Sequence, residues 1–218
     1  MSITPETVQK KLESEDLGDR LRGVNEIRQL EPAIGFELVQ SAIKDKNARV
    51  RYSAVSQFDT LGGQDLDKSL NLLRELLQDP EADVQAAAAD CLGGLKLVAA
   101  FDDLQQLYQS TNEWIVKLSV IAALGELGEP RGFEMLVRAL SDDNDLVKTA
   151  AISSMGELGN TQAVAVLAPF ASDSDWQIRY RVAQALNRLG TPEAKPILEN
   201  LENDEVEAVA EEAKKGQP

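Results

Sequence analysis

The sequence predicts an all-α fold in which short helical pairs stack as a solenoid. The first observation is a phrase at Asp142–Gly159 that recurs at 173–190 and at 110–128. Each copy carries an apolar anchor, and the anchors Val116, Val147 and Ile178 are 31 residues apart. Self-similarity at a fixed period of roughly 20–50 residues is typical of repeat proteins, in which neighbouring copies bury a shared core.

The second observation is a helical period inside each copy. Within 144–158 the apolar residues recur at three- and four-residue spacing, which is the period of an amphipathic helix and not of a strand. We therefore expect each repeat to hold a helix A, a tight turn and a helix B that carries the anchor. The expected B helices are 17–31, 47–62, 81–95, 112–127, 144–158, 175–189 and 204–214. A helices are expected at 66–78 and 131–140, and Thr4 with Pro5 begins a first helix that runs to about Ser14.

Aspartate and glycine mark the expected ends of the B helices. An aspartate lies five residues before four of the anchors, where its carboxylate can accept turn and helix amides: Asp45, Asp79, Asp142 and Asp173. Leu-Gly pairs close four copies and place glycine at a left-handed C-cap: 61–62, 127–128, 158–159 and 189–190. Lys96 replaces this glycine in the third copy. Small residues after the anchors predict close helix packing: Ala54, Ala88, Ala123, Ala151 and Ala185.

These repeats predict one solenoid over residues 1–218, built from about six to seven helical pairs of 31–34 residues. Residues 1–31 form a divergent first copy, and residues 192–218 form a last one that Val206 opens. Terminal repeats have only one neighbour and need a polar outer face. We therefore expect both segments to act as caps.

Composition excludes several classes of function. A net charge of −15 opposes binding to nucleic acid or to an anionic membrane, and no apolar run approaches the roughly 20 residues of a membrane span. The chain has no histidine and one cysteine, which excludes zinc, iron–sulfur and Cys-His sites, so no metal site is expected. The N-terminus MSITPETVQKK lacks the apolar core of a secretory signal, and Cys91 alone can form no internal disulfide. A cytoplasmic location is expected.

The repeated phrase D-x-x-V-[RK]-x-x-A-A-x-x-x-[LM]-G-x-L-G resembles short HEAT repeats of the type found in phycobilin lyases, over nearly the whole chain. The segment LESEDLGDRLRGVNEIRQL, the length and the acidity look more specifically like the NblB family of phycobilisome degradation proteins, which are relatives of the lyases. That family is cyanobacterial. The resemblance implies phycobiliproteins such as phycocyanin and allophycocyanin as partners. It also implies a bilin such as phycocyanobilin as a ligand, with no permanently bound cofactor.

A basic row is the first candidate binding feature, because B helices line the inner, concave face of HEAT-type solenoids. It consists of Arg20, Arg51, Lys117, Lys148 and Arg179, reinforced by Arg22, Arg49 and Arg181. A cation in the first turn opposes the helix dipole at a cost of about 0.3–1 kcal/mol each, so another interaction must compensate for it. The row is either an internal ladder to the turn aspartates of adjacent repeats or a strip for acidic partners or for the two propionates of a tetrapyrrole.

Aromatic residues near the starts of the B helices are the second candidate. Trp114 and Trp176 each lie two residues before an anchor, Tyr180 is expected to stack on Trp176 four residues away, and Tyr52 is the equivalent of Tyr180. These rings either pack between repeats or form the wall of a groove for a flat ligand or a partner helix. Together with Asp145, the candidate groove is Trp114, Lys117, Asp145, Lys148, Trp176, Arg179, Tyr180, Arg181, Tyr52 and Arg51. Cys91 aligns with small core positions and is expected in the core.

Two functions follow from these residues and from the resemblance. One is a HEAT-repeat factor that binds phycobiliproteins or bilins, resembles phycobilin lyases and acts in phycobilisome degradation or chromophore handling. The other is a non-enzymatic HEAT adaptor that holds a protein partner in its concave groove. No catalytic residue can be assigned, so enzymatic and non-enzymatic action are both open. A ligand surface requires Trp176, Arg179 and Tyr180 to be partly exposed, while Ile178 is expected in the core.

Overall fold

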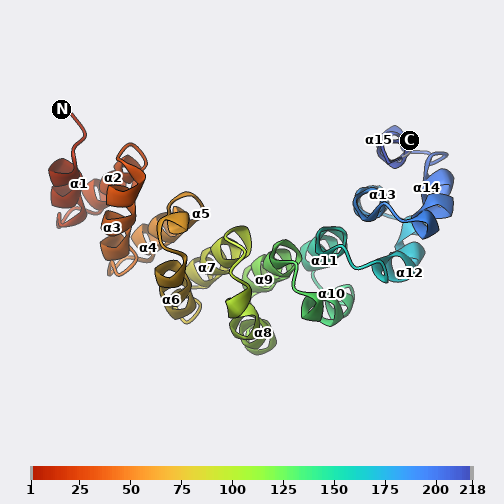
Figure 1. Ribbon diagram of the computed structural model, residues 1–218, viewed down its shortest axis with the longest axis horizontal. Coiled ribbons are helices and arrows are strands. Elements are labelled where there is room, and N and C mark those ends of the chain that lie inside the picture. The colour runs from red at the N-terminus through yellow and green to blue at the C-terminus, as the bar shows by residue number, and fades with distance from the viewer. Residues whose placement is uncertain (1, 217–218) are drawn as a thin grey trace. The chain divides into compact units, whose positions relative to one another are not determined.

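A computed structural model describes residues 2–216, and their regular structure is entirely helical, which confirms the all-α, solenoid-like fold class (Figure 1). Within this range no helix is both long and apolar enough to cross a membrane. The helices that carry the argument are α1 (Pro5–Leu12), α2 (Leu17–Ile27), α3 (Pro32–Ala42), α4 (Ala48–Val55), α5 (Phe58–Leu61), α6 (Leu66–Leu76), α7 (Ala82–Gly94), α8 (Phe101–Ser110), α9 (Trp114–Leu127), α10 (Phe133–Ala139), α11 (Asp145–Leu158), α12 (Ala163–Leu167), α13 (Trp176–Leu189), α14 (Lys195–Leu201) and α15 (Glu207–Lys214). Short 3-10 segments join several of them.

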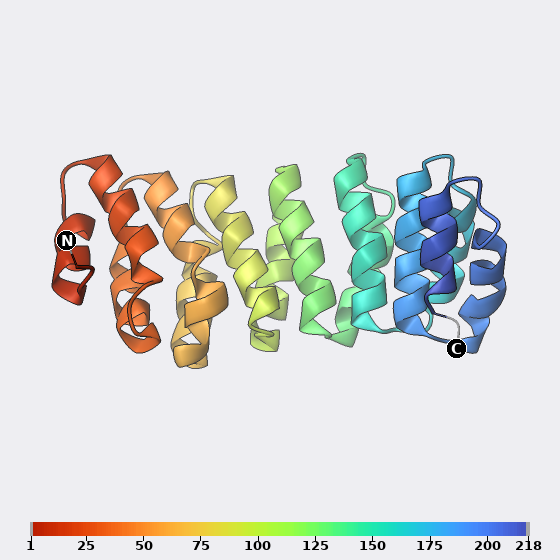
Figure 2. The same cartoon turned by 90° about the horizontal axis from the view of Figure 1, so that it is seen from above.

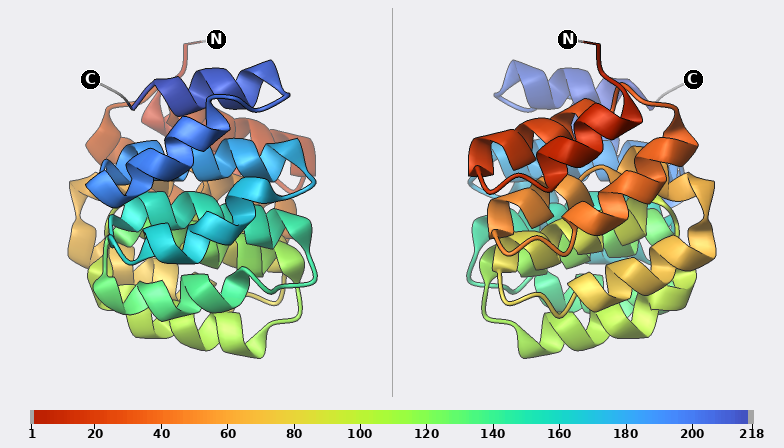
Figure 3. Two further views of the ribbon diagram at one scale, coloured as in Figure 1. Left: turned by 90° about the vertical axis from the view of Figure 1, so that its right-hand side faces the viewer. Right: turned by 90° about the vertical axis from the view of Figure 1, so that its left-hand side faces the viewer.

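The chain forms two compact units, and the boundary between Ser119 and Val120 lies inside α9. In the first unit α2 packs on α4 and α4 on α7, while α3 and α6 cover α4 and α7 (Figure 2). Figure 3 (right) shows α1, in red, against α2 in this unit. In the second unit α11 packs on α13 and α13 on α15, with α10 against α11 and α14 against α15 (Figure 3, left). The arrangement of one solenoid over residues 1–218 stays a prediction.

The B helices bury a recurring set of positions. In α11 the anchor Val147 is buried, and so are the residues four, five, seven and eight positions after it, which include Ala151, Ile152 and Met155. The same offsets are buried in α13, whereas its anchor Ile178 is only half-buried. The anchor of α11 therefore lies in the core, although Leu158 at the end of the same expected stripe is only half-buried, and in α13 the buried stripe begins at Val182 instead of Ile178.

Small residues set the distance between neighbouring B helices. A Cβ added to Gly156 on α11 would lie 2.7 Å from Cα of Ala185 on α13. A Cβ added to Gly125 on α9 would lie 2.7 Å from Cβ of Ser154 on α11. Each glycine lies nine residues past its anchor and faces the small residue seven past the next anchor. The predicted close packing thus depends on glycine as well as on alanine.

The second B helix is interrupted, which corrects the expected helix at 47–62. Here α4 ends at Val55 and α5 begins at Phe58. Gln57 lies between them, is buried, and donates from Nε2 to the carbonyl oxygen of Val24 at 2.6 Å. In the next copy the smaller Cys91 occupies this position, is buried as predicted, and its Sγ lies 3.3 Å from the carbonyl oxygen of Val55.

The predicted left-handed glycine C-cap is confirmed in three copies, and the prediction is wrong in one. Positive φ angles occur at 128, 159 and 190, where φ is 67°, 73° and 59°, and at Lys96, where φ is 54°. Gly62 has φ −62° and does not cap a helix in the left-handed conformation. It is small for a different reason, because a Cβ there would lie 2.6 Å from Cδ1 of Leu95.

The last copy has a different register from the predicted one. Val206 is the N-cap of α15, and its amide donates to Asp204 Oδ1 at 2.8 Å. Asp204 is therefore the turn aspartate of this copy, and the buried anchor five residues later is Val209 instead of Val206.

Candidate functional site

Three arginines of the predicted basic row bind turn aspartates of the following repeat. The Nε–Oδ2 distances are 2.7 Å for Arg20–Asp45, 2.7 Å for Arg51–Asp79 and 2.6 Å for Arg179–Asp204. Each aspartate also accepts the amide two residues after it, as Asn47 N–H donates to Asp45 at 2.7 Å. The internal ladder, one of the two interpretations of the basic row, is therefore present at these three positions.

The same arginines also hold the turn that precedes their own helix. Nη1 of Arg51 donates to the carbonyl oxygen of Asp45 at 2.9 Å, and Nη1 of Arg179 donates to that of Asp173 at 2.8 Å. Each guanidinium thus connects its own turn to the next repeat. Arg179 is only 8% exposed, so the expectation of a partly exposed Arg179 is wrong. Arg51 is likewise largely buried, and the described hydrogen bonds engage the guanidinium donors of both residues.

These contacts change the acidity of two carboxyl groups. The hydrogen bond from Arg179 lowers the pKa of Asp204, and the amide of Val206 acts in the same direction against the effect of burial. Burial alone would raise the pKa of Asp79, but hydrogen bonds from Arg51 and from the Glu81 amide lower it overall. Both aspartates are therefore more firmly ionised in the folded protein than in the unfolded chain.

Two repeats depart from this pattern. Gln85 takes the place of the arginine. Its Nε2 donates to the carbonyl oxygen of Asp79, in the turn before its own helix, at 2.8 Å, but the side chain carries no charge. The next turn has Thr111 in place of aspartate. At this position of the ladder both residues, Gln85 and Thr111, are therefore neutral. Lys148 binds Asp145 of its own helix, with Nζ 2.8 Å from Oδ1, and this hydrogen bond raises the pKa of Lys148.

The predicted aromatic residues are exposed, but they belong to different units. Tyr52 is 48% exposed and Trp114 is 44% exposed in the first unit, where Lys117 is half-buried in the same helix as Trp114. Trp176 is 43% exposed at the start of α13 in the second unit. Within the part of the chain that the structure describes, Trp176 and Tyr180 form no ring stack. The half-buried ring of Tyr180 instead lies 5.9 Å from the guanidinium carbon of Arg181.

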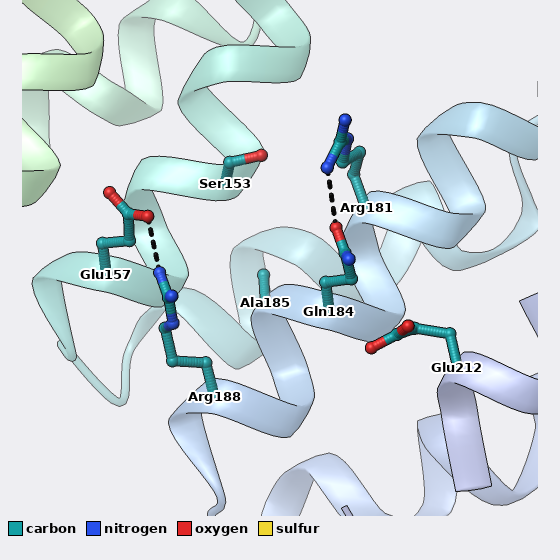
Figure 4. Close-up of a pocket in the computed structure, with 7 residues that line it drawn as sticks. All are labelled: Ser153, Glu157, Arg181, Gln184, Ala185, Arg188 and Glu212. Atoms are coloured by element: carbon teal, nitrogen blue, oxygen red, sulfur yellow. Dashed lines mark hydrogen bonds and ion pairs between the residues drawn. The ribbon is translucent and has the colours of Figure 1, made fainter. Parts of the chain in front are cut away.

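Arg181 lines a polar cleft of about 380 Å³ in the second unit. The cleft lies on three successive B helices, and Figure 4 shows its lining residues Ser153 and Glu157 of α11, Arg181, Gln184, Ala185 and Arg188 of α13, and Glu212 of α15. Known small-molecule sites have volumes of roughly 300–1,000 Å³. The cleft is therefore large enough to hold a group of ligand size.

Hydrogen bonds order the polar side chains of the cleft. Nη1 of Arg181 donates to Oε1 of Gln184 at 2.8 Å, and Nε2 of Gln184 donates to Oη of Tyr180 at 3.2 Å. Nη1 of Arg188 lies 2.5 Å from Oε1 of Glu157 on the neighbouring helix. Among the predicted groove residues, the structure thus brings Tyr180 and Arg181 together at this cleft and pairs Asp145 with Lys148 in the turn of α11.

Comparison with known proteins identifies the repeats. The sequence profile described as HEAT repeats matches residues 35–125, 70–156 and 133–215, which together span most of the chain. The chain belongs to the HEAT-repeat family. No curated protein sequence matches it.

Solved structures share this HEAT-repeat fold. The complex of CpcE and CpcF of phycocyanin lyase from Nostoc sp. PCC7120 is 23% identical, with a TM-score of 0.67, and the match covers 99% of this chain and 87% of that chain. YibA of Escherichia coli is 16% identical, with a TM-score of 0.71 and coverages of 97% and 80%. Kap95p, in a structure with RanGDP, is 12% identical, with a TM-score of 0.64 and coverages of 96% and 34%.

Sequence analysis found only part of the cleft of this HEAT-repeat protein. It identified Arg181 but not Glu157, Gln184, Arg188 or Glu212. Residues 181, 184 and 188 follow a helical period beside the core stripe, so one polar face of α13 could have been recognised. The contribution of Glu212 depends on how α15 packs on α13, which no local pattern indicates.

Proposed function

We propose that this HEAT-repeat protein binds phycobiliproteins through their bilin-bearing surface, as a relative of the phycobilin lyases that acts in phycobilisome degradation or chromophore handling. The observation that carries the proposal is the arginine-containing cleft that lies on the three B helices α11, α13 and α15. It lies in a chain whose fold is similar to that of phycocyanin lyase subunits over nearly the full length of both. The NblB-like N-terminal segment supports a role in dismantling the antenna.

The chemistry of the cleft supports binding as the primary role. A bilin offers two propionates, which arginine can grip with two parallel hydrogen bonds, and a flat conjugated surface, which an aromatic ring can cover. Arg181 and Tyr180 present both groups from adjacent positions. The two glutamates of the cleft are bonded to cations, Glu157 to Arg188 and Glu212 to Lys215 at 2.7 Å. We therefore assign them a structural role and assign no residue a catalytic one.

Mixing the purified protein with phycocyanin, allophycocyanin and free phycocyanobilin tests the proposal. We expect co-elution with a phycobiliprotein in size-exclusion chromatography and a change in the visible absorbance of the bilin. Serum albumin, which is also acidic, is the control for unspecific association. If neither a complex nor a spectral change appears at micromolar concentrations of both proteins, the phycobiliprotein assignment is wrong.

The second candidate is a non-enzymatic adaptor for a protein segment. It is favoured by exposed apolar side chains at the starts of two neighbouring helices, Leu146 at 54% and Trp176 at 43% exposure. Large exposed apolar side chains are frequent in protein interfaces. Binding to apo-phycocyanin as tight as that to the chromophore-bearing form would favour this candidate, because the bilin would then contribute nothing.

A further inference from the structure

Arg181 differs from the other cations around the cleft in having no acidic partner. Arg188 is bonded to Glu157, and Lys215 is bonded to Glu212. Among residues 2–216, the guanidinium of Arg181 forms a hydrogen bond with the amide oxygen of Gln184 and lies near the ring of Tyr180, and it forms no ion pair. One positive charge of the cleft is therefore not neutralised, in a protein whose net charge is −15.

The surroundings of Arg181 orient its guanidinium. Gln184 accepts from Nη1 of Arg181 and donates to Oη of Tyr180, so its amide cannot turn without breaking a hydrogen bond. A guanidinium has five N–H donors, and the hydrogen bond to Gln184 uses one of them. Because the side chain of Arg181 is exposed, other donors remain accessible from solvent. Figure 4 shows Arg181 and Arg188 on either side of Ala185, with Glu212 across the cleft. Ala185 lines the cleft between them.

We propose that the cleft of α11, α13 and α15 is a carboxylate-binding site in which Arg181 is the anchoring cation and Gln184 its positioning residue. A carboxylate matches the fork of the guanidinium with two parallel hydrogen bonds, and it would neutralise the one unpaired charge of the cleft. The ion pair between Arg188 and Glu157 lies at the opposite side of the cleft.

The identity of the natural ligand rests on the proposed function, whereas the existence of the site does not. For a phycobiliprotein partner the carboxylate has two sources, a propionate of the bilin or an acidic side chain of the polypeptide. Both offer the same chemistry to Arg181, and the experiment separates them.

The site itself is tested with glutarate, a simple dicarboxylate, by following arginine Nε–H signals in ¹⁵N-labelled full-length protein. We expect millimolar glutarate to shift the signal of Arg181 in a saturable way. The signal of Arg138 is the control, because it is an exposed arginine of α10 in the same unit. Arg181→Gln removes this signal, so its effect is followed on the Nε–H signal of Arg188 in the same cleft: any saturable shift of that signal should be abolished by Arg181→Gln and left unchanged by Arg138→Gln. An unmoved Arg181 signal overturns the proposal.

The source of the carboxylate is tested with phycocyanobilin, its dimethyl ester, phycocyanin and apo-phycocyanin. We expect Arg181→Gln to weaken binding of the natural source at least about tenfold, the usual effect of losing a charged hydrogen bond. Arg181→Lys should recover part of this loss, because it restores the charge without the fork. Weaker binding of the ester assigns the carboxylate to the bilin, and tight binding of apo-phycocyanin assigns it to the polypeptide.

The two proposals fail in different ways. Equal affinity of Arg181→Gln and the parent for every probe that the parent binds overturns the carboxylate site and leaves the phycobiliprotein function standing. A saturable glutarate response without any binding of bilin or phycobiliprotein supports the site and contradicts the proposed function.

Discussion

Nε of Arg179 lies 2.6 Å from Oδ2 of Asp204, and Nη2 of the same guanidinium lies 2.9 Å from Oδ1, so one arginine grips one carboxylate with two hydrogen bonds. Both side chains are less than 10% exposed. Because Nη1 also binds the carbonyl oxygen of Asp173, the side chain connects the turn before α13 to the turn before α15. This contact attaches the last repeat to the one before it.

Arg179→Ala should therefore destabilise the protein by about 3 kcal/mol or more, since it leaves a buried aspartate without its partner. The sequence analysis expected a partly exposed Arg179, for which the same substitution would have been nearly neutral. Urea unfolding of both proteins measures the difference. Arg181→Ala, two residues away and exposed, is the matched control and should change stability by at most about 0.5 kcal/mol.

The pair should also give the protein a specific response to acid. Arg179 lowers the pKa of Asp204 below the ordinary value of 3.8. The pair therefore contributes fully above the pKa of the unfolded chain, and its contribution is lost as the pH falls through the lowered folded pKa. The free energy of unfolding of the parent should exceed that of Asp204→Asn by a constant amount above about pH 5 and by less below about pH 4. A difference that is unchanged from pH 7 to pH 3 would contradict the assignment.

Gly156→Ala should destabilise the second unit, because the new Cβ would lie 2.7 Å from the backbone of Ala185. Overpacking of this kind costs about 1–3 kcal/mol, which exceeds the roughly 1 kcal/mol that alanine contributes as a better helix former. Thermal unfolding followed by circular dichroism measures the loss. Gly63→Ala is the control, because no atom lies within 4 Å of its added Cβ, and it should be neutral or stabilising by up to about 1 kcal/mol.

Lys96→Gly should stabilise the first unit. Lys96 has φ 54°, in the left-handed region that costs an ordinary residue roughly 1–2 kcal/mol. Part of this gain is offset by the greater freedom of glycine in the unfolded chain, so a net gain of about 0.5–1 kcal/mol is expected. The reverse change, Gly159→Ala, should lose about 1 kcal/mol, since its φ is 73° and no atom crowds the added Cβ. Equal stability of Lys96→Gly and the parent would contradict this account.

The sequence predicted those features that depend on local position. The aspartates before the anchors and the glycines at 128, 159 and 190 behave as expected, because each depends on its own turn. Gly62 does not, because its environment is determined by Leu95 in the next repeat. Gln57 interrupts its helix while its side chain binds Val24 in the preceding repeat. Such contacts join residues about 30 positions apart and leave no local pattern.

The candidate site shows the same limit more strongly. Sequence reasoning found the basic row but could not choose between a ladder and a binding strip, because that choice depends on whether Asp204 reaches Arg179. It grouped Arg51 with Arg179 as groove residues, and both are engaged in ladder contacts. Arg181, two residues after Arg179 in the same helix, has no acidic partner among the described residues. Burial and pairing, and not residue type, separate the two roles.

The exposed aromatic residues allow binding to be separated from folding. Trp176 is 43% exposed at the first turn of α13, so Trp176→Ala should change stability by no more than about 0.5–1 kcal/mol. Tyr180 is half-buried and bonded to Gln184, so Tyr180→Ala should cost somewhat more while the fold is kept. Under the proposed function Tyr180→Ala should weaken binding to phycocyanin at least about tenfold, measured by titration of bilin absorbance, whereas a loss of the same size for Trp176→Ala is expected if the exposed apolar side chains at the helix starts also contact the partner. Leu186→Ala is the control in the same helix. Leu186 is fully buried, and its truncation should cost about 2–5 kcal/mol while the folded fraction binds as the parent does. If Trp176→Ala and Tyr180→Ala bind phycocyanin like the parent, or destabilise the protein as much as Leu186→Ala, the two rings serve packing and do not form part of a binding surface.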